Sequence, residues 1–474
     1  MAGGKWTAAD VASANQRSGF YINFIADAVA GMVGAEKGVV ALPITAGWGP
    51  SKQIVEITKQ ADLEAFFSSD STLGNANFLI KQSLKNANKV LAYRLDNGGA
   101  AATITVDLKV IVNAKYTGSY GNFSLTVEAD PVSGKNLKVN KGSTLLQTIN
   151  FDGTAADMVA KINASGSSYL GTATLSSAGT VNDGTTTMAG GTDGIAGIVA
   201  QDFTNCMAAF ETQVAKWNVF HAYTSDSAIQ DSIISWIKKL RGQGTYIQAV
   251  LGCALPANDA ASKTTAFNSA LTRALAINYE GIIYNYIMPY IDSVARSGAE
   301  YGARIAGLIA GYGPDYSLTY AILEDVTSLY HELTSDQIKS ANGKGVLTAF
   351  SDGEYYLIEK GINSLTVFSA TQHVGWSKIK NISVMDYYGN SVTKSANKNY
   401  IGKVLNDEAG QDALLGAIKD FNDKMVKGRY LKKGVTVGLH PDYASVGDQV
   451  FLQILNFIPV DSMDEMYVDI YVGR

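Results

Sequence analysis

The sequence is poor in the residues that build metal sites and disulfide frameworks. Its 474 residues include two cysteines and four histidines. Cys206 and Cys253 lie inside apolar segments, so we expect two buried thiols in a protein that folds in a reducing compartment. The histidines are far apart, and none has the spacing of a metal-ligand pair. The sequence therefore predicts no metal site.

Long hydrophobic runs and a strong net charge are also absent. No apolar stretch approaches the roughly 20 residues of a membrane-spanning helix, and the N-terminus lacks the basic and apolar segments of a signal peptide. Lys and Arg total 38 against 43 Asp and Glu, which gives a net charge of −5 and argues against a general polyanion binder. We expect a soluble protein that neither inserts into a membrane nor binds nucleic acid directly.

Enzyme motifs are scarce as well. Residues 342–348, NGKGVLT, hint at a phosphate-binding loop, but Gly345 stands where that motif needs Ser or Thr. Residues 311–317, GYGPDYS, follow a helical pattern, which is the wrong order for a dinucleotide site. No G-x-S-x-G elbow occurs. We therefore predict no catalytic residue, no cofactor and no enzyme. The competing interpretation, a cytosolic α/β enzyme with an accessory β domain, requires a clustered site.

The residues that are present indicate a globular, multidomain α/β protein. Hydrophobic residues make up 46% and charged residues 17%, and the length is enough for three or four domains. A strand pattern at 216–224, a helical pattern at 226–241 and a strand pattern at 245–255 form a βαβ unit, which predicts a partly parallel sheet. Residues 99–195 are rich in Gly, Thr, Ser and Asn and alternate in polarity, which predicts an inserted β-sandwich.

The predicted fold class is thus α/β (α+β) with an inserted β-sandwich domain. The predicted parts are an N-terminal arm with a strand, a discontinuous α/β domain, the inserted sandwich and a C-terminal α/β domain, at residues 1–25, 26–98 plus 196–360, 99–195 and 361–474. In the C-terminal part a helix is well signalled at 407–427, with Asn406 as its expected cap. Two strand patterns, 450–460 and 465–472, follow it.

Both ends of the chain have the alternation of a strand. The first pattern follows a polar leader and the last stops two residues before the C-terminus. An unpaired strand edge invites another chain, so pairing between subunits and pairing within one chain are both open. The candidate exchange residues are Phe20, Tyr21, Ile22, Asn23 and Phe24 at the first end, and Tyr467, Val468, Asp469, Ile470, Tyr471 and Val472 at the last.

One cluster of positive charge stands out in the sequence. It follows the helix predicted at 407–427 and comprises Lys424, Lys427, Arg429, Lys432 and Lys433. Lysines at a helix C-terminus complement its dipole, so a solvated helix end explains the cluster. A docking patch for an acidic partner explains it as well, and no interleaved stacking platform points to nucleic acid.

A series of motifs runs in a fixed order from residue 18 to residue 472. They are SGFYINF (18–24), KGVVALPITAGWGP (37–50), AKYTGSYGNFSLTV (114–127), GGTDG (190–194), AGLIAGYGPDYSLTYAIL (306–323), GINSLT (361–366), KIKNISVMDYYGNSV (378–392), YIGKVLNDEAGQDALLGAI (400–418) and PVDSMDEMYVDIYV (459–472). In this order they resemble the tail sheath proteins of contractile phage tails and phage-tail-like particles of Gram-positive bacteria. Ser18, Gln411 and Asp412 depart from the family pattern, which has Pro at the first position and often Arg near the other two.

The resemblance implies a fold and a role. It implies a conserved α/β sheath core, formed largely by the C-terminal region next to the inner tube, and terminal strands that complete the sheets of neighbouring subunits. The implied partners are further copies in stacked six-fold rings that form a helical sheath, the inner tail tube protein, and the baseplate and tail terminator proteins. On this basis the basic cluster is our candidate tube contact.

The resemblance also implies a function and a location. The subunit would polymerise around the tube and contract to drive it through the target envelope for genome delivery. It would belong to the virion tail and assemble in the host bacterial cytoplasm. A genome-free injection system or phage-tail-like bacteriocin is the alternative within this class, and a capsid or baseplate structural protein fits the ordered motifs poorly.

Overall fold

The computed structural model describes residues 3–4, 20–21, 31–68, 72–213, 216–443, 445 and 447–472. The chain falls into two compact units. The main unit comprises Gly34–Asn390 with Pro459–Arg474, and the terminal unit comprises Met1–Val33 with Ser391–Ile458. Helices and strands alternate along the chain, so the predicted α/β class is confirmed. The domain boundaries predicted from the sequence stay predictions.

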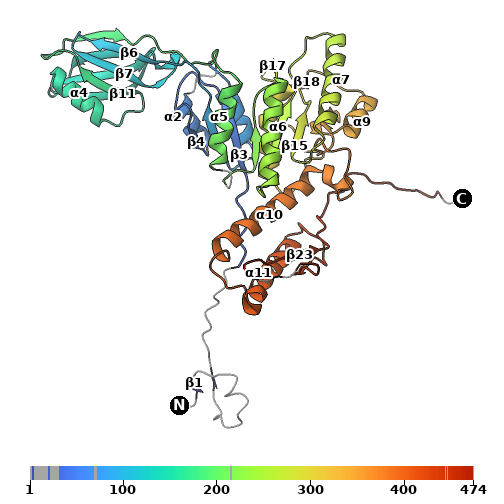
Figure 1. The fold of residues 1–474 in the computed structure, drawn as a ribbon. Helices are drawn as coiled ribbons and strands as arrows, with labels where there is room; N and C mark the ends of the chain where they lie inside the picture. The colour runs from blue at the N-terminus through green and yellow to red at the C-terminus, as the bar shows by residue number, and fades with distance from the viewer. Residues whose placement is uncertain are drawn as a thin grey trace. The chain divides into compact units, whose positions relative to one another are not determined.

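A seven-stranded sheet lies at the centre of the main unit (Figure 1). Its order is β19–β15–β14–β13–β3–β5–β4, and neighbours are parallel except β4, which is antiparallel to β5. The strand bounds are β3 Val39–Ile44, β4 Ile54–Ile57, β5 Lys89–Arg94, β13 Val219–His221, β14 Gln248–Gly252, β15 Ile282–Asn285 and β19 Val346–Leu347. The parallel pairing of β13 with β14 confirms the predicted βαβ unit.

Helices cover both faces of this sheet. Their bounds are α2 Gln60–Phe67, α3 Ala76–Leu84, α5 Ala200–Glu211, α6 Ser227–Gly242, α7 Ala260–Ile277, α8 Gly298–Tyr312 and α9 Ser335–Gly343. As a result, the side chains of strand β3 are buried on both faces of the sheet. Val40, Leu42 and Ile44 pack in one core with α2, α3 and α8. Val39 and Ala41 pack in a second core with α5, α6 and α7. A wholly buried, apolar strand is typical of a parallel sheet between two helical layers.

Short elements complete the main unit. A three-stranded sheet has the order β17–β16–β18, and β20 pairs with β21 in a hairpin. Their bounds are β16 Pro289–Ile291, β17 Val294–Ala295, β18 Ser328–Leu329, β20 Ala349–Ser351 and β21 Tyr356–Ile358, with 3-10 turns η1 Ser119–Gly121 and η3 Val374–Ser377.

Residues 101–187 form two antiparallel sheets around one core. The sheets have the orders β10–β9–β8–β12 and β11–β7–β6. Their bounds are β6 Ala101–Val106, β7 Val110–Thr117, β8 Ser124–Ala129, β9 Lys135–Lys141, β10 Thr144–Phe151, β11 Leu170–Leu175 and β12 Gly184–Thr187, and helix α4 Ala155–Ala164 packs on β11 (Figure 1). Val112 of one sheet and Leu125 of the other belong to the same buried cluster. Alternating strands that share a core in this way form a sandwich.

A buried arginine joins this sandwich to the central sheet. The side chain of Arg94, at the end of β5, has no solvent exposure. Its guanidinium donates to the carbonyls of Ala46, Gly49, Thr117 and Asp193 at 2.7–3.1 Å. These acceptors belong to the loop after β3, to the end of β7 and to the segment that leaves the sandwich. One side chain therefore fixes three crossing segments.

The surroundings of Arg94 are both charged and tightly packed. Burial lowers the pKa of Arg94, and the carboxylate of Asp96, 3.7 Å away, opposes that shift. Trp48, 2% exposed, reaches from the loop after β3 into the sandwich core and meets Phe123 edge to face with ring centroids 5.3 Å apart. Gly118 has φ +137°, and a Cβ there would overlap the carbonyl oxygen of Gly47. Only glycine fits that position, so the junction is packed rather than loose.

The terminal unit contains α11 Glu408–Lys427 and a hairpin of β22 Thr436–Leu439 with β23 Leu452–Leu455. Its N-terminal part holds β1 Gly3–Gly4 and β2 Phe20–Tyr21, which pair in parallel. Helix α10, Ile379–Asn399, begins in the main unit and ends in the terminal unit.

The predicted cap of α11 was wrong. The cap is Asp407, whose carboxylate accepts from the amide of Gly410 at 2.8 Å. Asn406 instead donates to the carbonyls of Gly447 and Gln449. The amide is therefore engaged by a loop far away in sequence, and the next residue takes the capping role.

We predict that Arg94→Met destabilises the main unit by about 3 kcal/mol or more, because four buried carbonyls lose a charged donor. Urea unfolding followed by tryptophan fluorescence measures this change. The matched control is Lys339→Met, since Lys339 is 80% exposed in a surface ion pair, and we expect it to change the free energy of unfolding by less than about 0.5 kcal/mol. Equal effects of the two substitutions would show that Arg94 does not hold the junction.

Candidate assembly surfaces

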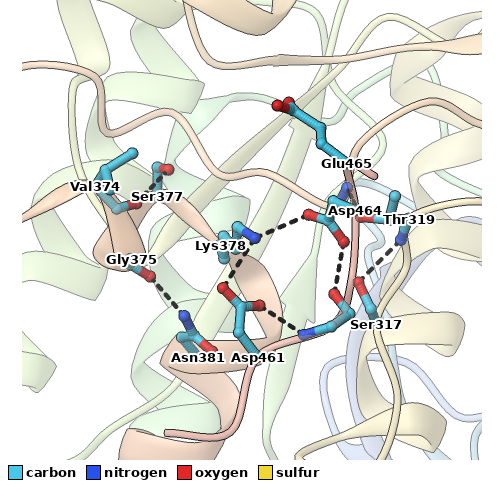
Figure 2. A network of polar contacts seen from close by, with 12 residues as sticks. Ser317, Thr319, Val374, Gly375, Ser377, Lys378, Asn381, Asp461, Asp464 and Glu465 are labelled. Carbon is cyan, nitrogen blue, oxygen red and sulfur yellow. Dashed lines mark hydrogen bonds and ion pairs between the residues drawn. The ribbon is translucent and has the colours of Figure 1, made fainter. Parts of the chain in front are cut away.

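The last part of the chain is held to the main unit at its base by Lys378. The ammonium of Lys378 lies 2.8 Å from a carboxylate oxygen of Asp461 and 2.9 Å from one of Asp464 (Figure 2). The hydroxyl of Ser462 donates to Asp464 at 2.6 Å and so orients that carboxylate. Lys378 directly precedes α10, so both carboxylates also lie near a helix N-terminus, where negative charge is favoured.

The electrostatics of this anchor favour its charged form. Burial opposes the charge on Lys378, but hydrogen bonds to Asp461 and Asp464 outweigh that cost and raise its pKa. A second ion pair joins Lys360 to Glu465 at 2.5 Å. Hydrogen bonds from Lys360 and from the hydroxyl of Tyr467 lower the pKa of Glu465. Both shifts favour the charged forms of Lys378 and Glu465 at neutral pH.

Beyond the anchor, the chain buries almost nothing. We call Met466–Val472 the closing segment. Six of its seven side chains are apolar or aromatic, and each of the six is at least 78% exposed: Met466, Tyr467, Val468, Ile470, Tyr471 and Val472. Asp469 is also exposed. Exposed apolar side chains in one run mark an interaction site more often than an accident.

The strand predicted at 465–472 does not form within the described part of this chain. The structure assigns no strand to residues 456–472. A strand is defined by hydrogen bonds to a neighbour, and the alternating pattern of the closing segment finds no such neighbour among the described residues. Its pairing with another subunit stays a prediction.

The first candidate strand is described only in part. Phe20 and Tyr21 form β2, whereas Ile22, Asn23 and Phe24 lie outside the described residues. Among the residues described after that point, the amide of Val33 donates to the hydroxyl of Ser395, near the end of α10, at 2.9 Å.

The five basic residues form an exposed group at the end of α11. Lys424 and Lys427 lie in the last turn of the helix, and Arg429, Lys432 and Lys433 lie in the loop that follows. All five are exposed, and none takes part in an ion pair within the described chain. Arg429 adopts φ +63°, which turns the chain sharply out of the helix. The structure brings all five together, and their contact with a tube stays a prediction.

The central sheet has a hollow of about 970 Å³ at the carboxyl ends of β3 and β13. The strand order reverses between these two strands, and open α/β sheets commonly bind ligands at such a point. Four of the charged side chains that line it form two ion pairs, because Lys85 lies 2.8 Å from Asp325 and Arg296 lies 2.6 Å from Glu300.

The most perturbed histidine is a core residue. His221 is fully buried beside Gly302, and its Nδ1 lies 2.9 Å from the carbonyl oxygen of Val250. Burial lowers its pKa to about 4, so the ring is neutral at pH 7. Cys206 and Cys253 are buried too, as the sequence predicted. Among the described residues, no group of three or more His, Cys, Asp or Glu is placed to hold a metal ion, and no described helix is long and apolar enough to span a membrane.

Three segments of the chain match known protein families. Residues 37–95 match the tail sheath protein Gp18 domain III N-terminal region. Residues 196–364 match the phage tail sheath protein central domain, and residues 371–473 match the phage tail sheath C-terminal domain. The chain belongs to the phage tail sheath protein family. The predicted resemblance is confirmed, and the C-terminal match includes α11, the basic group and the whole closing segment of this tail sheath protein.

Relatives and solved structures agree with this family over nearly the whole length. The chain is 27% identical over 513 aligned residues to the phage-like element PBSX protein XkdK of Bacillus subtilis, with 100% of both chains covered. A sheath tail protein of Desulfitobacterium hafniense shares the fold with a TM-score of 0.74 at 23% identity, over 95% of this chain and 99% of its own. The helical sheath of the anti-feeding prophage in its contracted state gives 0.57 at 10% identity, over 96% and 99%.

Sequence reasoning missed the anchor at the base of the closing segment. Lys378 and Asp461 stand in two motifs that were both recognised, but their pairing depends on the fold and leaves no local signal. The one available hint is charge, since Asp461, Asp464 and Glu465 precede an otherwise apolar run. Such a cluster of acidic residues can attract a basic partner, but the sequence does not say which one.

We predict that Lys378→Met loosens the base of the closing segment. The substitution leaves the carboxylate of Asp464, whose side chain is 8% exposed, without its cation, which is costly at a mostly buried site. Hydrogen exchange of the backbone at residues 461–465 should become about tenfold faster or more. Mass spectrometry of deuterated peptides measures this rate, and Lys339→Met again serves as the control. Unchanged exchange would mean that the ion pairs contribute nothing to the anchor.

Proposed function

We propose that this protein is the structural, non-catalytic subunit of a contractile tail sheath. It polymerises around an inner tail tube and contracts to drive the tube through a target cell envelope, and in a phage this delivers the genome. The observation that carries the proposal is the closing segment. Its base is held by Lys378 and Lys360, while its side chains are exposed and its strand pattern is unpaired within the described chain.

In this proposal the closing segment and the N-terminal strand each add to the sheet of a neighbouring copy. The hairpin of β22 and β23 offers an acceptor, because in the described chain these strands pair only with each other. About five backbone hydrogen bonds at a net ~1 kcal/mol each make one such link modest. Many links in one lattice add through multivalency. A strand on an extended tether also lets the subunit body rotate while its link persists.

The proposed partners follow from the same role. They are further copies in stacked rings, the inner tail tube protein, and the baseplate and tail terminator proteins. The proposed location is the contractile tail of a particle assembled in the bacterial cytoplasm. A genome-free injection system or bacteriocin uses the same subunit chemistry, and the genes beside this one separate the two, since capsid and terminase genes imply a phage.

The first test is negative-stain electron microscopy of the full-length protein with the inner tube protein present. We expect stacked rings or tubes from the full chain. Chains lacking residues 1–25 or 466–474 should lose them, because each truncation removes one proposed link. Monodisperse small particles from the full-length chain under these conditions would refute the proposed function.

The second test concerns the basic group. Reversal of Lys427, Arg429, Lys432 and Lys433 to Glu should reduce tube-templated assembly about tenfold or more at low salt, with less effect at high salt, because screening weakens exposed charges. Sedimentation of sheath with preformed tube measures the yield. A matched control reverses four exposed lysines of the main unit, Lys59, Lys216, Lys238 and Lys339. Equal yields from both variants would exclude the basic group as the tube contact.

A further inference from the structure

The hollow at the carboxyl ends of β3 and β13, which we call the sheet hollow, has room for a small organic molecule. Its volume is about 970 Å³, which is in the range of ligand pockets. Its walls come from the loop after β3, from α3, from the turn between β16 and β17, from the start of α8 and from the loop 324–327. Lys81, Asp292 and Glu324 line it, and no ion pair of the described chain includes these three.

Polar contacts hold the walls of the sheet hollow in place. The amide of Thr45 donates to the side-chain oxygen of Asn75 at 2.7 Å, and the amide of Asn75 donates to the hydroxyl of Thr45 at 3.1 Å. The guanidinium of Arg296, which pairs with Glu300, lies 4.2 Å from the centre of the Phe78 ring. These contacts fix the loop after β3 and the start of α8 to helix α3. Little further ordering is then needed when a ligand binds.

One buried amide that lines the sheet hollow lacks a hydrogen-bond donor. Gln82 of α3 is 5% exposed, and its amide nitrogen donates to a carboxylate oxygen of Asp325 at 2.7 Å. Its amide oxygen accepts no hydrogen bond from the described residues. Burial opposes the charge on Asp325, but hydrogen bonds from Lys85 and Gln82 outweigh that cost and lower its pKa. A buried acceptor without a donor is unfavourable, so Gln82 favours a ligand that carries N–H or O–H groups.

The charges that line the sheet hollow favour a cation. The lining holds four carboxylates and three cationic side chains, so the unpaired groups are Asp292 and Glu324 against Lys81. Tyr223, 42% exposed, adds an aromatic ring, and such rings attract organic cations. Among the described residues no group of three or more His, Cys, Asp or Glu is placed to hold a metal ion. An organic cation with N–H groups therefore fits this lining better than a metal ion does.

We propose that the sheet hollow binds an aliphatic ammonium group, whose N–H groups donate to Gln82 and to the carboxylates of Asp292 and Glu324. A small free diamine carries this group, and so does a lysine side chain of another protein. The lining belongs to one main unit, so binding needs no neighbouring subunit and does not depend on the sheath function. A ligand that binds only the folded protein also stabilises it against unfolding.

Isothermal titration calorimetry of the full-length protein with putrescine at low salt tests this site. We expect one molecule to bind per chain, at least about tenfold more tightly than tetramethylammonium, which has the charge but no N–H group. Binding of tetramethylammonium with equal affinity, or no binding of putrescine, would overturn the proposal.

A monoamine distinguishes the two sources of the ammonium group. n-Butylamine resembles the end of a lysine side chain and carries one ammonium, whereas putrescine carries two. Putrescine that binds at least about tenfold more tightly than n-butylamine would support a free diamine as the ligand. Equal affinities would show that one ammonium is sufficient, which supports a lysine side chain.

Removal of the two unpaired carboxylates tests their role. Asp292→Asn with Glu324→Gln should weaken putrescine binding about tenfold or more, because charge-assisted hydrogen bonds become neutral ones. The matched control is Asp336→Asn with Glu354→Gln, since both residues are exposed and neither lines the sheet hollow. We expect the affinity of the control to stay within about twofold of the wild type. Equal losses in the two variants would show a general effect of net charge and would refute a specific site.

Lys81 tests the sign of the ligand's charge. Lys81→Met removes a positive charge from the lining and should tighten putrescine binding about threefold or more. Lys81 is exposed, so we expect the fold to be unchanged, and thermal unfolding checks this. An anionic ligand requires the opposite result. If succinate, a dianion with the same number of carbon atoms, bound the wild type and Lys81→Met weakened that binding, the sheet hollow would be an anion site and the proposal would fall.

Discussion

The buried guanidinium of Arg94 is the interaction on which the main unit depends. A charge with no solvent exposure is tolerated only where donors and acceptors match, and here the match is made by carbonyls from segments of the chain far apart in sequence. The loop after β3, the end of β7 and the exit of the sandwich must all reach one side chain. The sandwich is therefore bonded to the central sheet within the main unit.

The closing segment differs from this buried junction because its side chains are exposed. Most of them are apolar or aromatic, and Ile470 is 82% exposed. In the proposed sheath, a neighbouring copy covers them. The ion pairs of Lys378 and Lys360 hold the base of this segment to the main unit.

Local patterns were sufficient where local physics decides the outcome. Helix α6 could be predicted from its apolar face and its cap, because Asp226 accepts from the amides of Ala228 and Ile229. The cap of α11 could not, because Asn406 and Asp407 both suit that role and a distant loop decides between them. Arg94 looks like any polar residue ending a strand, and the anchor at Lys378 depends on partners far along the chain. The contacts between residues far apart in sequence could therefore not be predicted from hydrophobic periodicity.

The buried junction at Arg94 and the exposed closing segment both suit a lattice that contracts. If a subunit must move by several ångströms without losing its neighbours, rigid packing between subunits cannot be its only connection, because packed interfaces switch between discrete states. A strand added to a neighbouring sheet keeps its hydrogen bonds while the tether behind it changes direction. The charged anchor at Lys378 gives that tether a fixed root, and the junction at Arg94 keeps the body intact. In the proposed sheath, deformation is thereby confined to short linkers, and binding energy gained in the contracted lattice is transmitted as motion of whole subunits.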